Sequence, residues 1–260
     1  MPLNRNQSPV GAVTFDLWDT VFLDDSDEPK RKQAGLPTKK VERRDLVGRF
    51  LNETGRPAPR EAIDRAYDET DEAFRKSWHD DHSTWTVTER LRRAFEKLGR
   101  ELPPEKLAEL VRLHEEMELR IRPNLIAGAS EALKALHIRY KLVVVSDAIF
   151  TPGRGLRELL SGYGLLDMFS GFVFSDEFGR SKPAPEVFHR AAELGGCRVG
   201  ELVHVGDREH NDIAGPHGVG ARAVLLTAGI DRGSANTKAD GICSDFKALF
   251  GIIESMDGAQ

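Results

Sequence analysis

The chain has little cysteine, no long apolar run and no excess of basic residues. Its two cysteines, Cys197 and Cys243, lie far apart without the spacing of a metal site, so we expect two reduced thiols. No apolar run reaches the roughly 18 residues that a membrane helix needs. Residues 1–9 lack the apolar core of a signal peptide. The net charge of −5 gives no general basic surface. We expect a cytoplasmic protein that binds neither nucleic acid nor membrane, in an unknown oligomeric state.

The chain does have the length and apolar content for a sizeable core. With 260 residues, 40% hydrophobic and 30% charged, it is typical of a globular protein with one large domain and a smaller one. Short apolar runs without internal alternation predict strands at residues 10–15, 140–145, 171–174, 202–205 and 222–226. Helical segments separate the last four strands, which predicts a parallel sheet covered on both faces.

Residues between the first and second predicted strands carry a different pattern. A charged, turn-rich connector follows the first strand from Asp24 to Lys32. From about Thr38 to Arg122, apolar residues repeat at helical spacing and predict a bundle of four amphipathic helices. The first strand must join the later ones, because a lone strand cannot bury both its faces. We therefore expect an α/β fold: a doubly wound core domain of residues 1–22 and 123–260, with residues 23–122 inserted as a helical domain.

Reactive or anion-binding residues follow four of the predicted strands. They are Asp16, Trp18, Asp19 and Thr20 after the first, Ser146 and Asp147 after the second, Ser181 and Lys182 after the third, and Asp207, Asn211 and Asp212 after the fourth. Because parallel strands end at the same edge of a sheet, these residues are expected to converge in space.

The converging residues fit phosphoryl transfer through an aspartyl intermediate. Asp16 would attack phosphorus, while a divalent cation and Lys182 cancel the repulsion between the two negative groups. Mg²⁺ prefers oxygen ligands, which Asp16, Asp207 and Asp212 can supply. The Ser146 hydroxyl would donate a hydrogen bond to the phosphoryl oxygens.

Four phrases in this order resemble the motifs of the haloacid dehalogenase-like hydrolase superfamily, over residues 13 to about 226. They are Asp16-Leu17-Trp18-Asp19-Thr20, Val145-Ser146-Asp147, Ser181-Lys182-Pro183-Ala184-Pro185-Glu186-Val187-Phe188, and Val205-Gly206-Asp207 with Asn211-Asp212. The resemblance implies a Rossmann-like core and a mobile helical cap that closes on a small phosphorylated substrate. It also implies Asp16 and Lys182 as catalytic residues and Ser146, Asp147 and Thr20 as substrate-binding residues. Mg²⁺ would be held by Asp16, Asp207, Asp212 and the backbone carbonyl of Trp18.

Trp18 is the one departure from that pattern. Phosphatases of the superfamily carry a second Asp here, which protonates the leaving group, and an indole cannot transfer a proton at neutral pH. A positioned acid contributes about 10²–10⁴-fold, so its loss weighs most on alkyl phosphates and less on acyl, aryl or enol phosphates. Asp19 is a poor replacement, because adjacent side chains of an extended segment point opposite ways. Our interpretation is a Mg²⁺-dependent phosphatase that lacks the usual acid for protonating the leaving group.

Three other functions remain open. Haloacid dehalogenases of the superfamily carry an aromatic residue at the position of Trp18, but they need no metal, and Asp207 and Asp212 favour one. A phosphonate hydrolase would need a Schiff-base lysine from the inserted helices, where lysines in charged helices are usually solvated; the candidates are Lys30, Lys32, Lys39, Lys40 and Lys76. A metal-binding pseudo-phosphatase or interaction protein would keep the fold without turnover.

Two further features have ambiguous patterns. Trp78, His79, Asp80, Asp81, His82 and Trp85 form either a substrate-facing loop or a polar turn anchored by two tryptophans, and their spacing alone does not predict a metal. His204 lies within an apolar strand and is expected to be a packed core histidine.

Overall fold

Six parallel strands form the sheet on which the structure is built. The computed structural model describes residues 8–257. The expectation about a signal peptide concerned residues 1–9, of which residues 1–7 lie outside the described residues. The strands lie in the order β3-β2-β1-β4-β5-β6. Their bounds are β1 Ala12–Phe15, β2 Lys141–Ser146, β3 Phe169–Phe174, β4 Leu202–Gly206, β5 Arg222–Leu226 and β6 Gly241–Cys243. The five predicted strands are confirmed, and β6, too short to give a hydrophobic signal, was not predicted.

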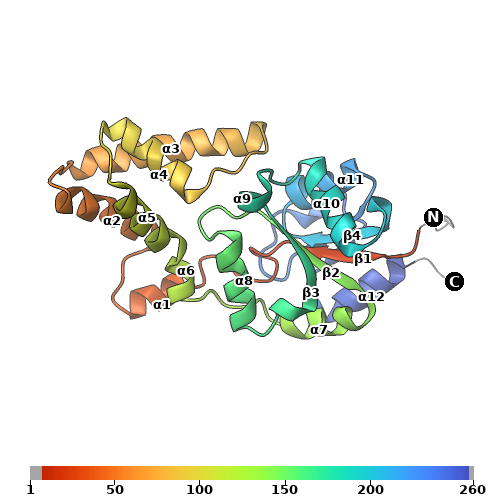
Figure 1. Ribbon diagram of the computed structural model, residues 1–260. Coiled ribbons are helices and arrows are strands. Elements are labelled where there is room, and N and C mark those ends of the chain that lie inside the picture. The colour runs from red at the N-terminus through yellow and green to blue at the C-terminus, as the bar shows by residue number, and fades with distance from the viewer. Residues whose placement is uncertain (1–7, 258–260) are drawn as a thin grey trace.

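Helices cover both faces of this sheet, which explains why its strands read as continuous apolar runs. Val13 and Phe15 of β1 belong to one buried cluster with residues of α7 (Ala129–Arg139), α8 (Gly153–Gly162) and α12 (Phe246–Met256), while Ala12, on the other side of the strand, belongs to a second cluster with residues of α10 (Pro185–Gly195). The helices that follow β2 and later strands are α8 Gly153–Gly162, α9 Ser175–Phe178, α10 Pro185–Gly195, α11 Gly215–Gly218 and α12 Phe246–Met256, and α7 Ala129–Arg139 precedes β2. Figure 1 shows α7 and α12 on one side of the sheet and α10 and α11 on the other. The expected α/β, Rossmann-like doubly wound fold is confirmed.

Short helical turns complete this part of the chain. They are the 3₁₀ helices η1 Leu166–Met168, η2 Val199–Glu201 and η4 Ser234–Asn236, and the π-helical turn η3 Glu209–Ala214, which holds Asn211 and Asp212.

Six helices lie between β1 and α7, and we refer to them as the inserted helices. Their bounds are α1 Glu28–Gln33, α2 Lys39–Glu53, α3 Arg60–Asp80, α4 Val87–Leu98, α5 Pro104–Glu115 and α6 Met117–Arg120. Helices α2 to α5 stand beyond the carboxyl edge of the sheet and share a core of their own, with Phe50, Leu91 and Leu110 buried at its centre (Figure 1). Local signals fix their ends: Thr86 and Glu89 form a capping box at α4, and Gly99 ends that helix in the left-handed region.

The charged connector after β1 is partly helical and partly buried, which its turn-rich composition does not predict. Its second half is α1, in which Arg31 is fully buried with an ion pair to Glu42, and Asp27 just before it is also buried. Lys39, expected to be solvated, is 4% exposed, with Nζ 2.8 Å from Asp27 and 2.9 Å from Glu118. These charges are buried as pairs made between distant segments, which hydropathy cannot reveal.

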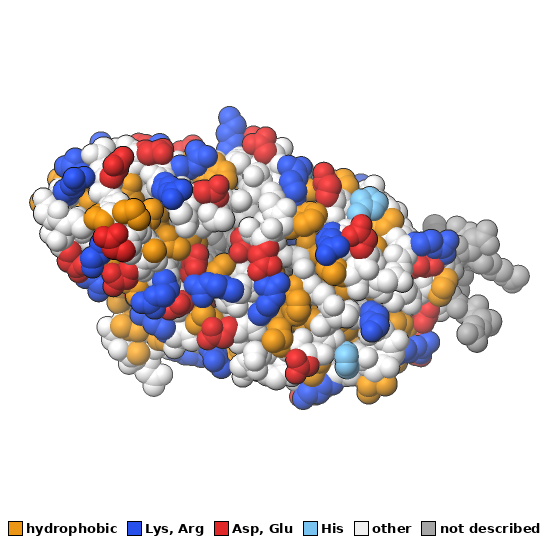
Figure 2. Space-filling model, in the orientation of Figure 1, with side chains coloured by type: hydrophobic (Ala, Val, Ile, Leu, Met, Phe, Trp, Pro, Cys, Tyr) orange, Lys and Arg blue, Asp and Glu red, His pale blue; other side chains and the backbone are white. Residues whose placement is uncertain are grey.

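The surface agrees with the mixed composition. On the face shown in Figure 2, acidic and basic side chains are interspersed over both the inserted helices and the sheet region. Among the helices of residues 8–257, none combines the length and apolar character needed to cross a bilayer.

Candidate active site

The register of the sheet brings the ends of β1, β2 and β4 side by side. Phe15 pairs with Val144 on one side and with Val205 on the other, and the Asp16 N–H donates to the Val205 carbonyl at 2.9 Å. Asp16, Ser146 and Asp207 therefore emerge at one edge from three adjacent strands, as parallel pairing requires.

Lys182 is the centre of this group. Its Nζ lies 2.6 Å from Asp16 Oδ1 and 2.6 Å from Asp212 Oδ1, and Ser146 Oγ donates to the same Asp16 oxygen at 3.0 Å. Lys182 is 3% exposed. Burial alone would lower its pKa, but the charges of Asp16, Asp212 and Asp147 outweigh burial and raise it. The lysine is therefore a permanent cation, suited to hold negative oxygens and unsuited to donate a proton.

Asp147 holds the segment that carries Lys182 in place through hydrogen bonds. Its Oδ1 accepts from the Lys182 backbone N–H at 3.1 Å, and its Oδ2 accepts from Asn211 Nδ2 at 3.2 Å. Burial raises the pKa of Asp147 to about 7, although Lys182 opposes that shift. Asp147 also lines the cavity described below, so it is within reach of a bound ligand as well as of the lysine loop.

Asp212 is held by a buried histidine that the sequence interpretation treated only as core. His204 Nε2 lies 3.1 Å from Asp212 Oδ1, and Thr14 Oγ1 lies 2.7 Å from His204 Nδ1. Burial lowers the pKa of His204, so the neutral ring donates through Nε2 and accepts at Nδ1. Burial would raise the pKa of Asp212, but Lys182 and His204 together lower it. His204 is thus a packed core residue that also orients a site carboxylate.

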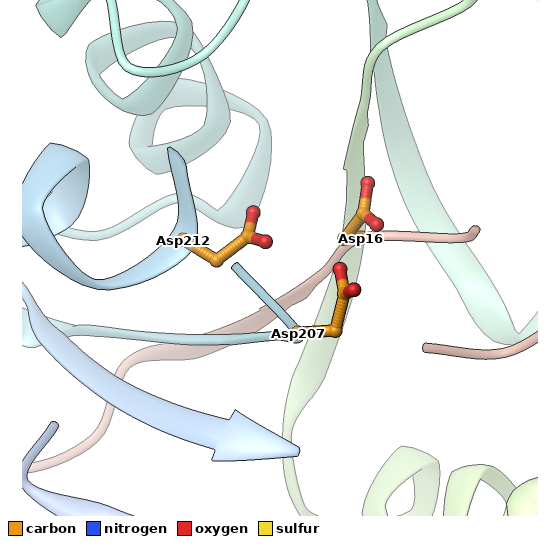
Figure 3. A group of neighbouring side chains, drawn as sticks. All are labelled: Asp16, Asp207 and Asp212. Carbon is orange, nitrogen blue, oxygen red and sulfur yellow. The ribbon is translucent and has the colours of Figure 1, made fainter. Parts of the chain in front are cut away.

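Three carboxylates face a common space at this edge. One oxygen each of Asp16, Asp207 and Asp212 lies within 4.8 Å of the other two (Figure 3). Burial, reinforced by the charges of Asp16 and Asp212, raises the pKa of Asp207 to about 7. Asp207 Oδ1 is buried, and within residues 8–257 it has no hydrogen-bond partner. The cation nearest to this oxygen is Arg208, whose Nε lies 3.8 Å away, too far for a hydrogen bond. A divalent cation would satisfy such an oxygen beside two further carboxylates, so these residues fit Mg²⁺.

Arg232 belongs to this group and was missed by the sequence interpretation. Its Nε lies 2.5 Å from Asp207 Oδ2, and its Nη2 lies 2.6 Å from Asp19 Oδ2. Asp19 has φ 55° and also accepts from the Asp24 N–H at 3.0 Å. Arg232 therefore fixes the rotation of Asp207. The loop that holds it follows β5, so extending the strand-end argument to the fifth strand would have pointed to it.

A cavity of about 280 Å³ lies between this edge and the inserted helices. From the edge it is lined by Asp16, Trp18, Asp147, Lys182 and Asp212. The inserted helices contribute Lys39, Arg43, Trp78 and Glu118.

Thr20 and Ser146 are placed differently from the other predicted site residues. Thr20 is fully buried with an unpartnered Oγ1 in the described chain, and it does not line the cavity. Ser146 contacts the site through Asp16 rather than through the cavity wall.

The Trp78–Trp85 segment splits into two parts. Trp78 and His79 belong to the last turn of α3, and only the residues after Asp80 form a loop. The His79 ring stacks on that of His210 with centroids 5.5 Å apart, so this segment meets the loop after β4. Trp78 is the member that lines the cavity.

Comparisons with known proteins agree on one family. A family model described as haloacid dehalogenase-like hydrolase matches residues 10–220. A Bos taurus protein, "Haloacid dehalogenase-like hydrolase domain-containing protein 3", is 32% identical over 104 residues, 40% of each chain. A "Glyceraldehyde 3-phosphate phosphatase" of Methanopyrus kandleri is 40% identical over 76 residues, 29% of this chain and 31% of that one. The chain thus covers less than half the length of either relative.

A solved structure shows the same fold over nearly the whole chain. It is a 2-haloacid dehalogenase from Pseudomonas syringae, with a TM-score of 0.65, 20% identity and coverage of 94% of this chain and 98% of that one. At this identity the likeness concerns the fold alone.

Proposed function

The chain belongs to the haloacid dehalogenase-like hydrolase family, and on that premise we propose that it is a Mg²⁺-dependent phosphatase of small phosphorylated metabolites. The observation that carries the proposal is the contact of Asp16 with Lys182 at 2.6 Å beside two further buried carboxylates. Phosphatase-named relatives support the same reaction. In this proposal residues 1–22 and 123–260 act as the core domain, and residues 23–122 act as a cap domain over the cavity.

Asp16 is the nucleophile in this mechanism. Ser146 and Lys182 both donate to Oδ1, so they fix the carboxylate before substrate binds. Asp16 attacks phosphorus, the leaving-group oxygen departs, and an aspartyl phosphate forms that water then hydrolyses. Lys182, cationic throughout, neutralises the phosphoryl oxygens as they gain charge. Asp147 keeps Lys182 in place through its backbone.

The metal would be held by Asp16, Asp207, Asp212 and the Trp18 carbonyl. When bound there, Mg²⁺ supplies positive charge that lowers the repulsion between carboxylate and phosphate. Arg232 keeps one oxygen of Asp207 occupied and leaves the other for a ligand role.

Trp18 sets the leaving groups that this site can handle. It is half-buried against Phe22, with ring centroids 5.9 Å apart, and it lines the cavity. Its indole gives the leaving-group oxygen no proton. We therefore propose acyl, aryl or enol phosphates as the better substrates.

A 2-haloacid dehalogenase is the second candidate, favoured by the aromatic residue at position 18. The three clustered carboxylates argue against it, because attack by Asp16 on a neutral carbon would need no metal charge to offset repulsion.

The test is a turnover assay with purified protein, p-nitrophenyl phosphate or acetyl phosphate, and Mg²⁺, Mn²⁺ or Co²⁺. We expect metal-dependent phosphate release that EDTA abolishes. If neither substrate turns over with any of the metals, the phosphatase proposal fails and the non-catalytic alternative gains. Halide release from 2-chloropropionate in the presence of EDTA would instead establish the dehalogenase.

A further inference from the structure

The wall of the cavity formed by the inserted helices contains a buried arginine without a carboxylate partner. Arg43, on α2, is 9% exposed, and within residues 8–257 its guanidinium makes no ion pair and its buried Nε has no hydrogen-bond partner. Its Cζ stacks 3.5 Å from the ring centroid of Phe150, which comes from the loop after β2. A buried, unpaired charge is costly, so such a group is typical of a binding site that a ligand completes.

The acids whose charges act on Arg43 are already engaged elsewhere. Glu118 Oε1 accepts from Lys39 Nζ at 2.9 Å, and Glu118 Oε2 bonds to Thr151 Oγ1. Asp71 accepts from Arg90 Nη2 at 2.5 Å. Burial accordingly lowers the pKa of Arg43.

Arg90 is an informative contrast to Arg43. It stacks on the same Phe150 ring, with Cζ 4.0 Å from the centroid, but it has its carboxylate and does not line the cavity. The stacking on Phe150 therefore does not by itself explain why Arg43 lacks an anion.

A second donor without an acceptor belongs to another residue that lines this cavity. Trp78 Nε1 is buried and, in the described part of the chain, has no acceptor. Arg43 and Trp78 both line the space that Asp16 and Lys182 line from the other side. Two side chains with unsatisfied donors therefore lie at this cavity, where a bound ligand can supply acceptors.

We propose that Arg43 and Trp78 bind a carboxylate carried by the leaving group, so that the substrate is the phosphate ester of a small carboxylic acid. This inference rests on the proposed phosphatase function. A planar carboxylate offers the two acceptor oxygens that the guanidinium and the indole N–H lack. A second phosphate fits less well, because Asp24, Asp25 and Glu118 line the same cavity and repel a dianion more than a monoanion.

The experiment compares aryl phosphates that carry a carboxylate at the ortho, meta or para position, each with its neutral carboxamide. An aryl leaving group departs without protonation, so the acid missing at Trp18 is not needed. The three positions vary the distance between the phosphoryl group and the carboxylate, because the distance from Asp16 to the proposed site at Arg43 is not fixed in advance. The readout is the ratio of kcat/KM for carboxylate to that for carboxamide. At the best position, Arg43→Met should lower this ratio about 10- to 100-fold, the effect of one charge-assisted contact. Arg43→Gln, which keeps a polar chain, should lower it as well.

Arg90→Met is the matched control, since it also removes a cation from the Phe150 ring. We expect it to leave the ratio unchanged. A wild-type ratio near one at all three positions, or an equal ratio in wild type and Arg43→Met, overturns the inference. The inference is also overturned if Arg43→Met lowers kcat/KM for pyrophosphate more than it lowers kcat/KM for the aryl phosphates that carry a carboxylate.

Failure of the proposed function would be distinguishable. If wild type releases no phosphate from any substrate, that function fails, and calorimetry on Asp16→Asn still measures binding of the same pairs. Binding of the carboxylate that is tighter than that of the carboxamide, and weakened by adding Arg43→Met, supports the subsite. Equal binding of the two overturns it.

Discussion

The sheet edge and the inserted helices both bury charge, but their unpartnered groups have opposite signs. At the edge, Asp16, Asp207 and Asp212 lie close together, and Asp207 has one oxygen without a hydrogen-bond partner in residues 8–257 and a pKa raised to about 7. Among the inserted helices, Lys39 and Arg90 have carboxylate partners, whereas Arg43 has none within residues 8–257. A cation would therefore complete the edge, and an anion would complete Arg43. A metal together with a substrate bearing two anionic groups would satisfy both.

The largest effect is expected from removing the cation at the sheet edge, which leaves its carboxylates with uncompensated negative charge. Lys182→Met should lower phosphatase activity by about 10²–10³-fold or more, because a preorganised cation on the phosphoryl oxygens is lost. It should also leave Asp16 and Asp212 buried without their shared cation, so Mg²⁺ should raise the melting temperature of the variant more than that of wild type. Activity assays and thermal unfolding with and without Mg²⁺ measure both effects.

Lys247→Met, at an exposed position in α12, is the control and should change neither quantity. Wild-type activity in Lys182→Met would remove the lysine from the mechanism.

Trp18→Asp should add the acid that the edge lacks. We expect kcat for alkyl phosphates to rise about 10²-fold, while acetyl phosphate, whose leaving group needs no proton, changes little. Comparing the two rates in wild type and variant isolates proton donation from other effects of the substitution. An equal change for both substrates would mean that the missing acid is not what limits the enzyme.

Arg232→Met tests whether the edge is organised for a metal. Its guanidinium carries charge that repels a cation, yet it is partly exposed, while its 2.5 Å contact fixes a fully buried Asp207. Orientation should outweigh the screened charge, so Mg²⁺ affinity measured by calorimetry should fall about tenfold. Tighter Mg²⁺ binding by the variant would show that Arg232 competes with the metal instead of positioning its ligand.

His114 offers a smaller test of the buried positive charge of Arg43 and Arg90. Burial, reinforced by Arg43 and Arg90, lowers the pKa of His114 to about 3, and its Nδ1 and Nε2 contact the Leu110 carbonyl at 2.8 Å and Tyr67 Oη at 2.7 Å. The unfolded chain takes up the proton below about pH 6.5, whereas the folded chain does so only near pH 3. The contribution of His114 to the free energy of unfolding is therefore full above about pH 6.5. It decreases on acidification by up to about 1.4 kcal/mol per pH unit.

Urea unfolding of wild type and His114→Gln at pH 7, 6 and 5 measures this slope. The variant should lose less free energy of unfolding between pH 6 and 5 than wild type does. Parallel pH profiles would mean that His114 is not buried in its neutral form.

The two regions also differ in how far the sequence predicted them. Asp16, Lys182, Asp207 and Asp212 could be grouped in advance because each follows a strand, and parallel pairing takes strand ends to one edge. Arg232 could have been added to this group by applying the same argument to the residues that follow β5. The bond of His204 to Asp212 depends on which face of β4 meets η3, which an apolar run does not specify.

The wall could not be predicted in the same way. Arg43 and Lys39 both lie in α2, a highly charged helix, and both are buried through contacts with segments far along the chain. That α1 buries Arg31 likewise depends on Glu42 of the next helix. Such pairings are set by tertiary packing, and local propensity or hydropathy carries no trace of them.

The central claim is that Asp16 takes up the phosphoryl group at an edge made ready by Lys182 and a metal. The most direct measurement is rapid acid quenching of the protein with acetyl phosphate and Mg²⁺, followed by peptide mass spectrometry. We predict a phosphoryl adduct on the peptide containing Asp16, absent without Mg²⁺ and absent in Asp16→Asn, which should also lose turnover. Turnover that persists in Asp16→Asn, or an adduct found only on another peptide, would contradict the account.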